Sequence, residues 1–216
     1  MADKQTPNQD MLNEIEGQAP ASMHPLLEAA FKYQKQLIIA VCAIVGVTVI
    51  YAAYNGYATS AMTTAQAELG AVRMEQNGPE KISKLEGLLN TVPGSVKPAV
   101  VLELAQASLA TKDYDKAVTY WETLAAEGDD MAYVARMGKA KALLLSGKAA
   151  DALAELKDVL AAAPEGYAIP INRQIALAAE AAGDNAQALA AYKLLAENNV
   201  NDKPFVDYKI AQLESK

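Results

Sequence analysis

Apolar residues recur at spacings of three and four along most of the chain after residue 98, the pattern of helices that are buried along one side. One series of such stripes contains Val101, Leu104 and Ala105, then Ala140, Leu143 and Leu144, then Ile175, Ala176 and Ala179. A second, similar stripe follows each of these after a short polar or Gly-containing segment. The pattern therefore predicts a series of helical hairpins.

A fixed period runs through these hairpins. The segments "KDYDKAVTYWETLA" (112–125), "GKAADALAELKDVLAAAP" (147–164) and "GDNAQALAAYKLLA" (183–196) share a turn, an Ala, a large apolar residue four positions later and an aliphatic residue three after that. The matched alanines are 35 residues apart from Ala117 to Ala152 and 36 apart from Ala152 to Ala188, the length of one helix-turn-helix unit. We expect the alanines to allow close helix approach and Trp121, Leu156 and Tyr192 to fill the space between successive hairpins.

These units resemble the tetratricopeptide repeat family, whose pattern has a turn with Gly, then Ala, a bulky residue and a closing Pro. The departures are Lys112 at the turn and Asp129 in place of Pro in one unit, Lys139 at a usual Leu position in the next, and the missing Pro after Gly183 and Asp184 in the last. The resemblance implies repeats at about 60–94, 98–131, 133–166 and 169–202. A capping helix at 204–214 would use Phe205, Tyr208 and Leu213 to cover the last exposed face.

A continuous apolar run precedes the repeats. Leu37 to Tyr54 contains no charged residue, and its 18 residues would form a helix of roughly 27 Å, close to the thickness of a bilayer's hydrocarbon core. No other segment is apolar enough to surround such a helix in a soluble domain. The fold class expected is thus all-α, with a single transmembrane helix at 37–54 and a tetratricopeptide-type α-solenoid at 58–216.

The charges around this run predict its orientation. Lys32 and Lys35 stand immediately before it, whereas the next basic residue is Arg73, so the N-terminus is expected in the cytoplasm and the repeats on the far side of the membrane. A cleaved signal peptide is the alternative, but the 36 residues in front are long and net acidic. We expect residues 1–36 to be a mostly disordered tail. Ala52 and Gly56 form a small-xxx-small pair that could contact another membrane helix.

The chemical inventory argues against catalysis. The net charge of −7 does not suit nucleic-acid binding. The one His, His24, and the one Cys, Cys42, fall before and within the expected span, which excludes a Cys-His or Ser-His-Asp arrangement and a Cys/His metal site in the repeats. The acidic stretch from Glu127 to Asp130 lacks the spacing of a calcium loop and is interpreted as a solvated turn. No catalytic residue, cofactor or metal site is predicted.

The resemblance to tetratricopeptide repeats also implies a concave face lined by first-helix side chains. Mapping that pattern selects Leu102, Gln106 and Leu109, then Met137, Lys141 and Leu144, then Arg173, Leu177 and Glu180. Members of the family that hold a peptide C-terminus use Lys and Asn where Leu102 and Gln106 stand here, which argues against that mode. Two interpretations remain open: these residues bind a partner protein, or they pack against the next repeat or the C-terminal helix.

The whole arrangement resembles the YfgM-like ancillary subunits of the bacterial Sec translocon. The resemblance rests on "VVLELAQASLATKDYDKA" (100–117), "ALLLSGKAADAL" (142–153) and "YKIAQLESK" (208–216) together with the order of tail, span and repeats. It implies a non-enzymatic adaptor, anchored once in the inner membrane, whose periplasmic repeats engage a chaperone or an emerging nascent chain. The alternative from another class is a scaffold for cell-envelope assembly or cell division built on the same repeats.

Overall fold

The computed structural model describes residues 33–128, 131–198 and 200–215. These residues are almost entirely helical and contain no strand, so the expected all-α class with tetratricopeptide-type repeats is confirmed. Most of the expected tail at 1–36, including His24, lies outside the described residues, as do Asp129 and Asp130. The chain divides into two units, Met1–Ser60 and Ala61–Lys216.

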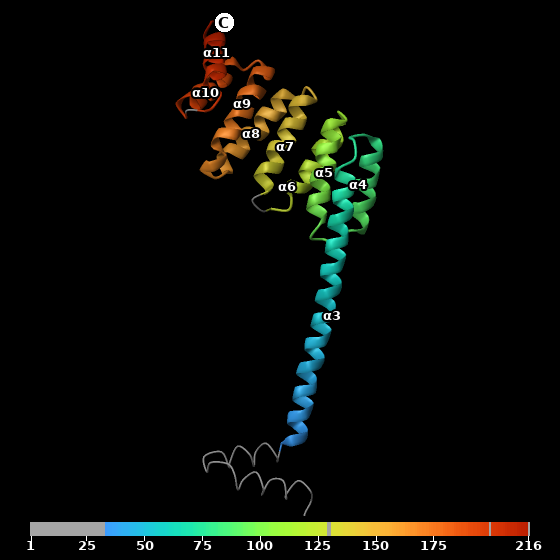
Figure 1. Ribbon diagram of the computed structural model, residues 1–216. Helices are drawn as coiled ribbons and strands as arrows, with labels where there is room; N and C mark the ends of the chain where they lie inside the picture. Colours follow the sequence, from blue (N-terminus) through green and yellow to red (C-terminus); the bar gives the residue numbers. More distant parts are fainter. Residues whose placement is uncertain (1–32, 129–130, 199, 216) are drawn as a thin grey trace, which may run out of the picture. The chain divides into compact units, whose positions relative to one another are not determined.

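The helices follow one another with short connections, as Figure 1 shows. They are α3 (Gln34–Arg73), α4 (Pro79–Thr91), α5 (Lys97–Ala110), α6 (Tyr114–Ala125), α7 (Met131–Leu145), α8 (Ala149–Ala162), the 3₁₀ turn η2 (Glu165–Tyr167), α9 (Ala168–Ala182), α10 (Asn185–Glu197) and α11 (Lys203–Glu214).

The first unit contributes the beginning of α3, which is long and apolar enough to cross a membrane. Its most apolar window has a mean hydropathy of 2.1, and none of that window is buried. The expected span at 37–54 and the beginning of the repeat expected at about 60–94 belong to this one helix, which continues to Arg73. The small pair of Ala52 and Gly56 lies on its exposed surface. Thr48 satisfies its own hydroxyl by donating to the main-chain oxygen of Ile44 at 2.8 Å.

The second unit is a stack of hairpins. The hairpin pairs are α5 with α6, α7 with α8 and α9 with α10, and the second helix of each packs against the first helix of the next element. Buried apolar side chains form three clusters along this stack, centred on α3 to α5, on α5 to α7 and on α7 to α11. The core is therefore divided along the chain, as in a solenoid whose repeats touch mainly their neighbours.

The repeating residues occupy equivalent places in the stack. Ala117, Ala152 and Ala188 are fully buried, which explains why a larger side chain does not recur at these positions. Trp121, Leu156 and Tyr192 are also buried, as the period predicted, and join neighbouring hairpins.

The turns between paired helices share one backbone conformation. Gly147 and Gly183 have φ of 83° and 79°, in the left-handed region, and Lys112 at the matching position has φ of 63°. A β-carbon is disfavoured in this region, so Lys112 occupies a place for which Gly is better suited. Two of the helices that follow are N-capped by Asp: Asp113 accepts from the amide of Lys116 at 3.3 Å, and Asp184 from that of Gln187 at 3.0 Å.

The departure at Lys139 is explained by an ion-pair network between helices. Lys139 Nζ lies 3.0 Å from Glu122 of α6 and 3.1 Å from Glu155 of α8, and Glu155 also pairs with Arg136. Burial favours the neutral form of Glu155, but the hydrogen bonds from Arg136 and Lys139 outweigh it and hold its pKa below the ordinary value. A charged residue replaces Leu here because the neighbouring helices supply its partners.

The capping helix α11 differs from expectation in one respect. Leu213 is buried as predicted, but its inner-face companion is Val206, while Phe205 and Tyr208 are 46% and 62% exposed. Val206, Ile210 and Leu213 recur at four and three residues and so share one face of the helix. Assigning Phe205 and Tyr208 to the inner face was therefore wrong. The helix is held to α9 by Lys209, whose Nζ lies 2.8 Å from Glu180.

Candidate partner-binding groove

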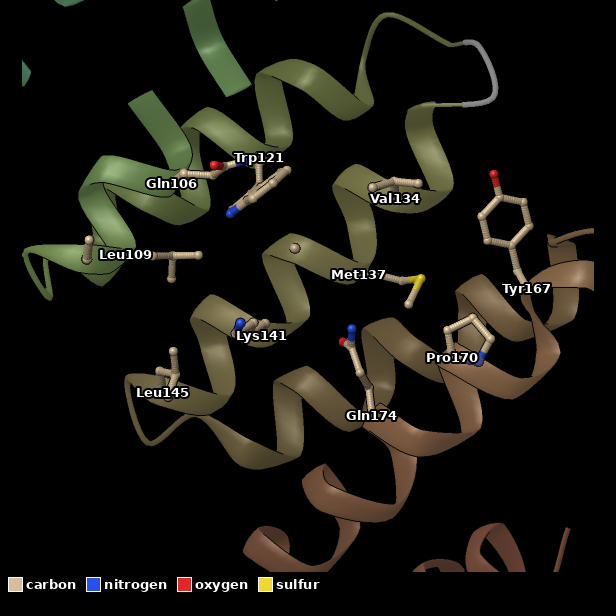
Figure 2. Close-up of a pocket in the computed structure, with 12 residues that line it drawn as sticks. Gln106, Leu109, Trp121, Val134, Met137, Lys141, Leu145, Tyr167, Pro170 and Gln174 are labelled. Atoms are coloured by element: carbon tan, nitrogen blue, oxygen red, sulfur yellow. The ribbon is translucent and has the colours of Figure 1, made fainter. Parts of the chain in front are cut away.

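A groove of about 740 Å³ lies on the second unit, bordered by the first helices of three successive hairpins. Figure 2 shows α7 between α5 and α9, with side chains from each directed toward the space around it. The lining residues are Gln106, Leu109 and Ala110 of α5, Trp121 of α6, Val134, Met137, Gly138, Lys141 and Leu145 of α7, Tyr167 of η2, and Pro170 and Gln174 of α9. Most of the lining is apolar.

Four of the residues selected from the sequence line this groove: Gln106, Leu109, Met137 and Lys141. They come from α5 and α7, and Gln106 and Lys141, 35 residues apart, occupy equivalent positions in successive units. Leu102 and Leu144 are half-buried and pack against the apolar core on either side of α7. The structure thus brings together four of the nine selected residues in the groove, whereas Leu102 and Leu144 pack against the core without lining it.

The remaining selected residues, all from α9, lie outside the groove. Arg173 forms an ion pair with Asp202, with Nη2 and Oδ1 2.8 Å apart, and this contact holds the pKa of Asp202 below its usual range. Glu180 accepts hydrogen bonds from Tyr192 and Lys209, both at 2.8 Å. Leu177 is 44% exposed. Arg173 and Glu180 therefore connect α9 to the C-terminal end of the stack.

The floor of the groove depends on a close contact between α6 and α7. Gly138 lies under the indole ring of Trp121, and a β-carbon placed there would be 2.5 Å from the ring atoms Cδ2 and Cε2. The absence of a side chain at Gly138 is therefore what lets the indole lie against the backbone of α7. The repeat period predicts Trp121 only in the space between hairpins, and its place in the groove is not predicted from the sequence.

The polar side chains in the lining are Gln106, Trp121, Lys141, Tyr167 and Gln174. Trp121 Nε1 and Gln174 Oε1 are buried and have no hydrogen-bond partner. Lys141 is the only charged residue in the lining; it is exposed and forms no ion pair with another described residue. This arrangement can bind apolar, hydrogen-bonding and anionic groups at once.

Nothing in the groove forms a catalytic constellation. Its lining has no carboxylate, His or Cys to act as a base or nucleophile. Among the residues for which the structure gives positions, no group of three or more His, Cys, Asp or Glu side chains could hold a metal ion. Cys42 stands alone on the exposed surface of α3.

Several lining residues were missed by sequence reasoning. Val134 and Leu145 share the helical spacing of Met137 and Lys141, so the face of α7 could have been extended in both directions from the sequence. Tyr167, Pro170 and Gln174 carry no comparable signal, because their place depends on how η2 turns the chain into α9.

No protein-family model and no curated protein matches the chain. Among solved structures, MamA from Desulfovibrio magneticus RS-1, from residue 41 to its end, is similar with a TM-score of 0.51, 15% identity, and coverage of 73% of this chain and 93% of that one. The RS-1 MamA ArsTM double mutant is similar with a TM-score of 0.50, 18% identity, and coverage of 73% and 94%. MamA is an all-helical, tetratricopeptide-like protein, and the likeness concerns the fold.

Proposed function

We propose that the chain is a non-enzymatic, membrane-anchored adaptor that binds other proteins through the groove over α5, α7 and α9. The observation that carries this is the groove itself: it combines apolar walls, unpaired polar atoms and a free cation with no catalytic group. Binding of protein segments is the activity that such a lining favours. The most apolar part of α3 is not buried by any other part of the structure, and exposing so large an apolar surface to water is unfavourable. This supports a membrane anchor.

The finer proposal is a place beside the Sec translocon of a bacterial inner membrane. The N-terminus would lie in the cytoplasm and the repeats in the periplasm, in keeping with Lys35 before the span and Arg73 as the first basic residue after it. Anchoring the repeats near the channel exit would raise the local concentration of a chaperone or nascent chain, so weak groove contacts would suffice. Ala52 and Gly56 are proposed to contact a membrane helix of the channel.

Proximity crosslinking in intact membranes tests both proposals. A photoreactive residue at Leu109 samples the groove, another at Ala52 samples the span, and a third at Asp158, on the exposed surface of α8, serves as the matched control. We expect Ala52 to crosslink to a translocon subunit and Leu109, but not Asp158, to crosslink to a chaperone or nascent chain.

Other outcomes separate the alternatives. Groove crosslinks only to envelope-assembly or cell-division proteins, with no product at Ala52, would replace the translocon adaptor with a scaffold of that kind. Equal crosslinking yields at Leu109 and Asp158 would contradict the proposal that the groove is the binding surface. If alkaline carbonate extracts the protein from membranes, the proposal that the chain is anchored in the membrane is wrong.

A further inference from the structure

The chain contains two Asn-Gly pairs, and they stand in different structural settings. Asn55 and Gly56 lie inside α3, whereas Asn77 and Gly78 lie in the segment between α3 and α4. In an Asn-Gly pair the main-chain nitrogen of Gly can attack the side-chain amide of Asn with little hindrance, because Gly has no side chain and its backbone is permissive. The local conformation of each pair therefore decides whether the attack occurs.

The main chain at Asn77 and Gly78 is open to solvent. Asn77 is exposed, and Gly78 is extended, with φ of 179° and nothing within 4 Å of the place where a β-carbon would stand. Pro79, at the start of α4, disfavours a helical conformation in the residue before it and so keeps the pair outside the helix. Within the described part of the chain, neither the Gly78 amide nor the Asn77 side chain forms a hydrogen bond. Both reacting groups are therefore available.

The pair inside α3 is held in an unreactive arrangement. In an α-helix each amide donates to the carbonyl oxygen four residues earlier, so the nitrogen of Gly56 is already engaged. The Cα–Cβ bond of a helical residue is tilted toward the N-terminus of the helix, which directs the Asn55 side chain away from the amide that follows it. Reaction at Asn55 would require local opening of the helix, which costs free energy.

We propose that Asn77 is a site of spontaneous deamidation, which converts it to aspartate and isoaspartate, whereas Asn55 is protected. The main-chain nitrogen of Gly78 loses its proton to hydroxide and attacks Cγ of Asn77. The new N–Cγ bond closes a succinimide ring, and the Cγ–Nδ2 bond breaks as ammonia leaves with a proton from water. Water then opens the ring, at Cγ to give aspartate or at the main-chain carbonyl carbon to give isoaspartate. The reaction consumes water, releases ammonia and transfers no electrons.

The position of Asn77 gives this modification a structural consequence. The end of α3 and the start of α4 are tied together by Lys81, which is buried and donates from Nζ to the main-chain oxygen of Arg73 at 3.0 Å. Either product places a negative charge beside the N-terminus of α4, where the N-cap Gly78 offers no side chain and a charge of this sign is favourable. Isoaspartate also lengthens the main chain between the two helices. Deamidation therefore changes the charge and the length of this connection while both helices remain in place.

Trypsin isolates the site, because Arg73 and Lys81 delimit the peptide 74–81. The full-length protein in detergent micelles is incubated at neutral and at mildly alkaline pH and digested at intervals. Mass spectrometry then detects the replacement of an amide NH2 by OH, and the peptide 36–73 of the same digest reports on Asn55. Gly78→Ala is the matched variant, since its β-carbon would meet nothing and its extended backbone suits any residue, while the methyl group hinders the attack.

We expect Asn77 to convert more than about tenfold faster than Asn55, because helix opening must precede reaction at Asn55. The rate at Asn77 should rise with pH, since the attacking nitrogen is deprotonated, and Gly78→Ala should slow the conversion severalfold. Equal rates at Asn55 and Asn77, or no conversion of Asn77 at alkaline pH, would overturn the inference. These measurements concern the segment between α3 and α4 alone, so neither result bears on the crosslinking test of the proposed function.

Discussion

The indole ring of Trp121 lies against the backbone of α7 at Gly138, so closely that a β-carbon at Gly138 would be 2.5 Å from two ring atoms. This contact joins the second helix of one hairpin to the first helix of the next and forms part of the groove floor. Position 138 must therefore be Gly for a reason of packing, because its backbone is ordinary helix.

Replacing Gly138 with Ala should destabilise the protein by about 1–2 kcal/mol, because overpacking against the ring exceeds the gain in helix propensity. Gly87 provides the control, since it lies inside α4 with nothing near a β-carbon, and Gly87→Ala should stabilise by about 0.5–1 kcal/mol. The free energies of unfolding from urea titration check both. Equal effects at the two positions would contradict the close contact.

Lys112 offers a test of the turn geometry. Its φ of 63° disfavours a β-carbon, so Lys112→Gly should raise the free energy of unfolding by about 0.5–1 kcal/mol, even after allowing for the greater freedom of Gly in the unfolded chain. The reverse change at the matching turn, Gly147→Lys, should lower it by about 1 kcal/mol. Because the two substitutions are opposite, turns of the same conformation require changes of opposite sign in the free energy of unfolding. Changes of the same sign would contradict the shared conformation.

The two faces of α11 should respond differently to truncation. Leu213 is 6% exposed, so Leu213→Ala should cost about 2–3 kcal/mol, whereas Tyr208→Ala, at 62% exposure, should change stability by less than about 0.5 kcal/mol. Thermal unfolding followed by circular dichroism measures the difference. If Tyr208→Ala lowers the stability more than Leu213→Ala does, then Tyr208 lies on the inner face of α11 and the assignment made here is wrong.

Glu155 should make stability depend on acid pH. Because its pKa in the folded protein is below 4.5, the stabilisation is fully present above about pH 4.5 and is lost as pH falls through the lower folded value. Glu155→Gln should cost about 1–3 kcal/mol at neutral pH and flatten the decline toward about pH 3. Unfolding curves at several pH values compare the two proteins, and parallel declines would argue against the network around Arg136 and Lys139.

The sequence predicted the parts of the fold that recur. The alanines at 117, 152 and 188 established the hairpin period, and the residue four places after each was correctly expected to be buried. The face of α11 was mistaken because Phe205 and Tyr208 are the most conspicuous apolar residues of that helix. Its inner face is set instead by the smaller side chains of Val206 and Leu213, at a seven-residue spacing.

The groove could be predicted only where the repeat register determines it. Gln106 and Lys141 follow from that register, since they are equivalent positions of successive first helices and both line the groove; Leu109 and Met137 also line it, but their equivalents Leu144 and Leu102 do not. The roles of Trp121 and Gln174 depend on how closely neighbouring helices approach. That distance is set by side-chain volume in three dimensions, and no one-dimensional pattern contains it.

The division of the core into clusters along the stack has a kinetic consequence. Because most contacts join elements adjacent in the chain, the contact order is low, and folding is expected to be fast and to begin within single hairpins. A hairpin could begin to form as soon as its own 35 or so residues have been synthesised, and it would gain stability when the neighbouring hairpins pack against it. Within the described residues α11 packs mainly against α10, whereas α7 packs against α6, α8 and α9, so opening at α11 should require less free energy than opening at α7.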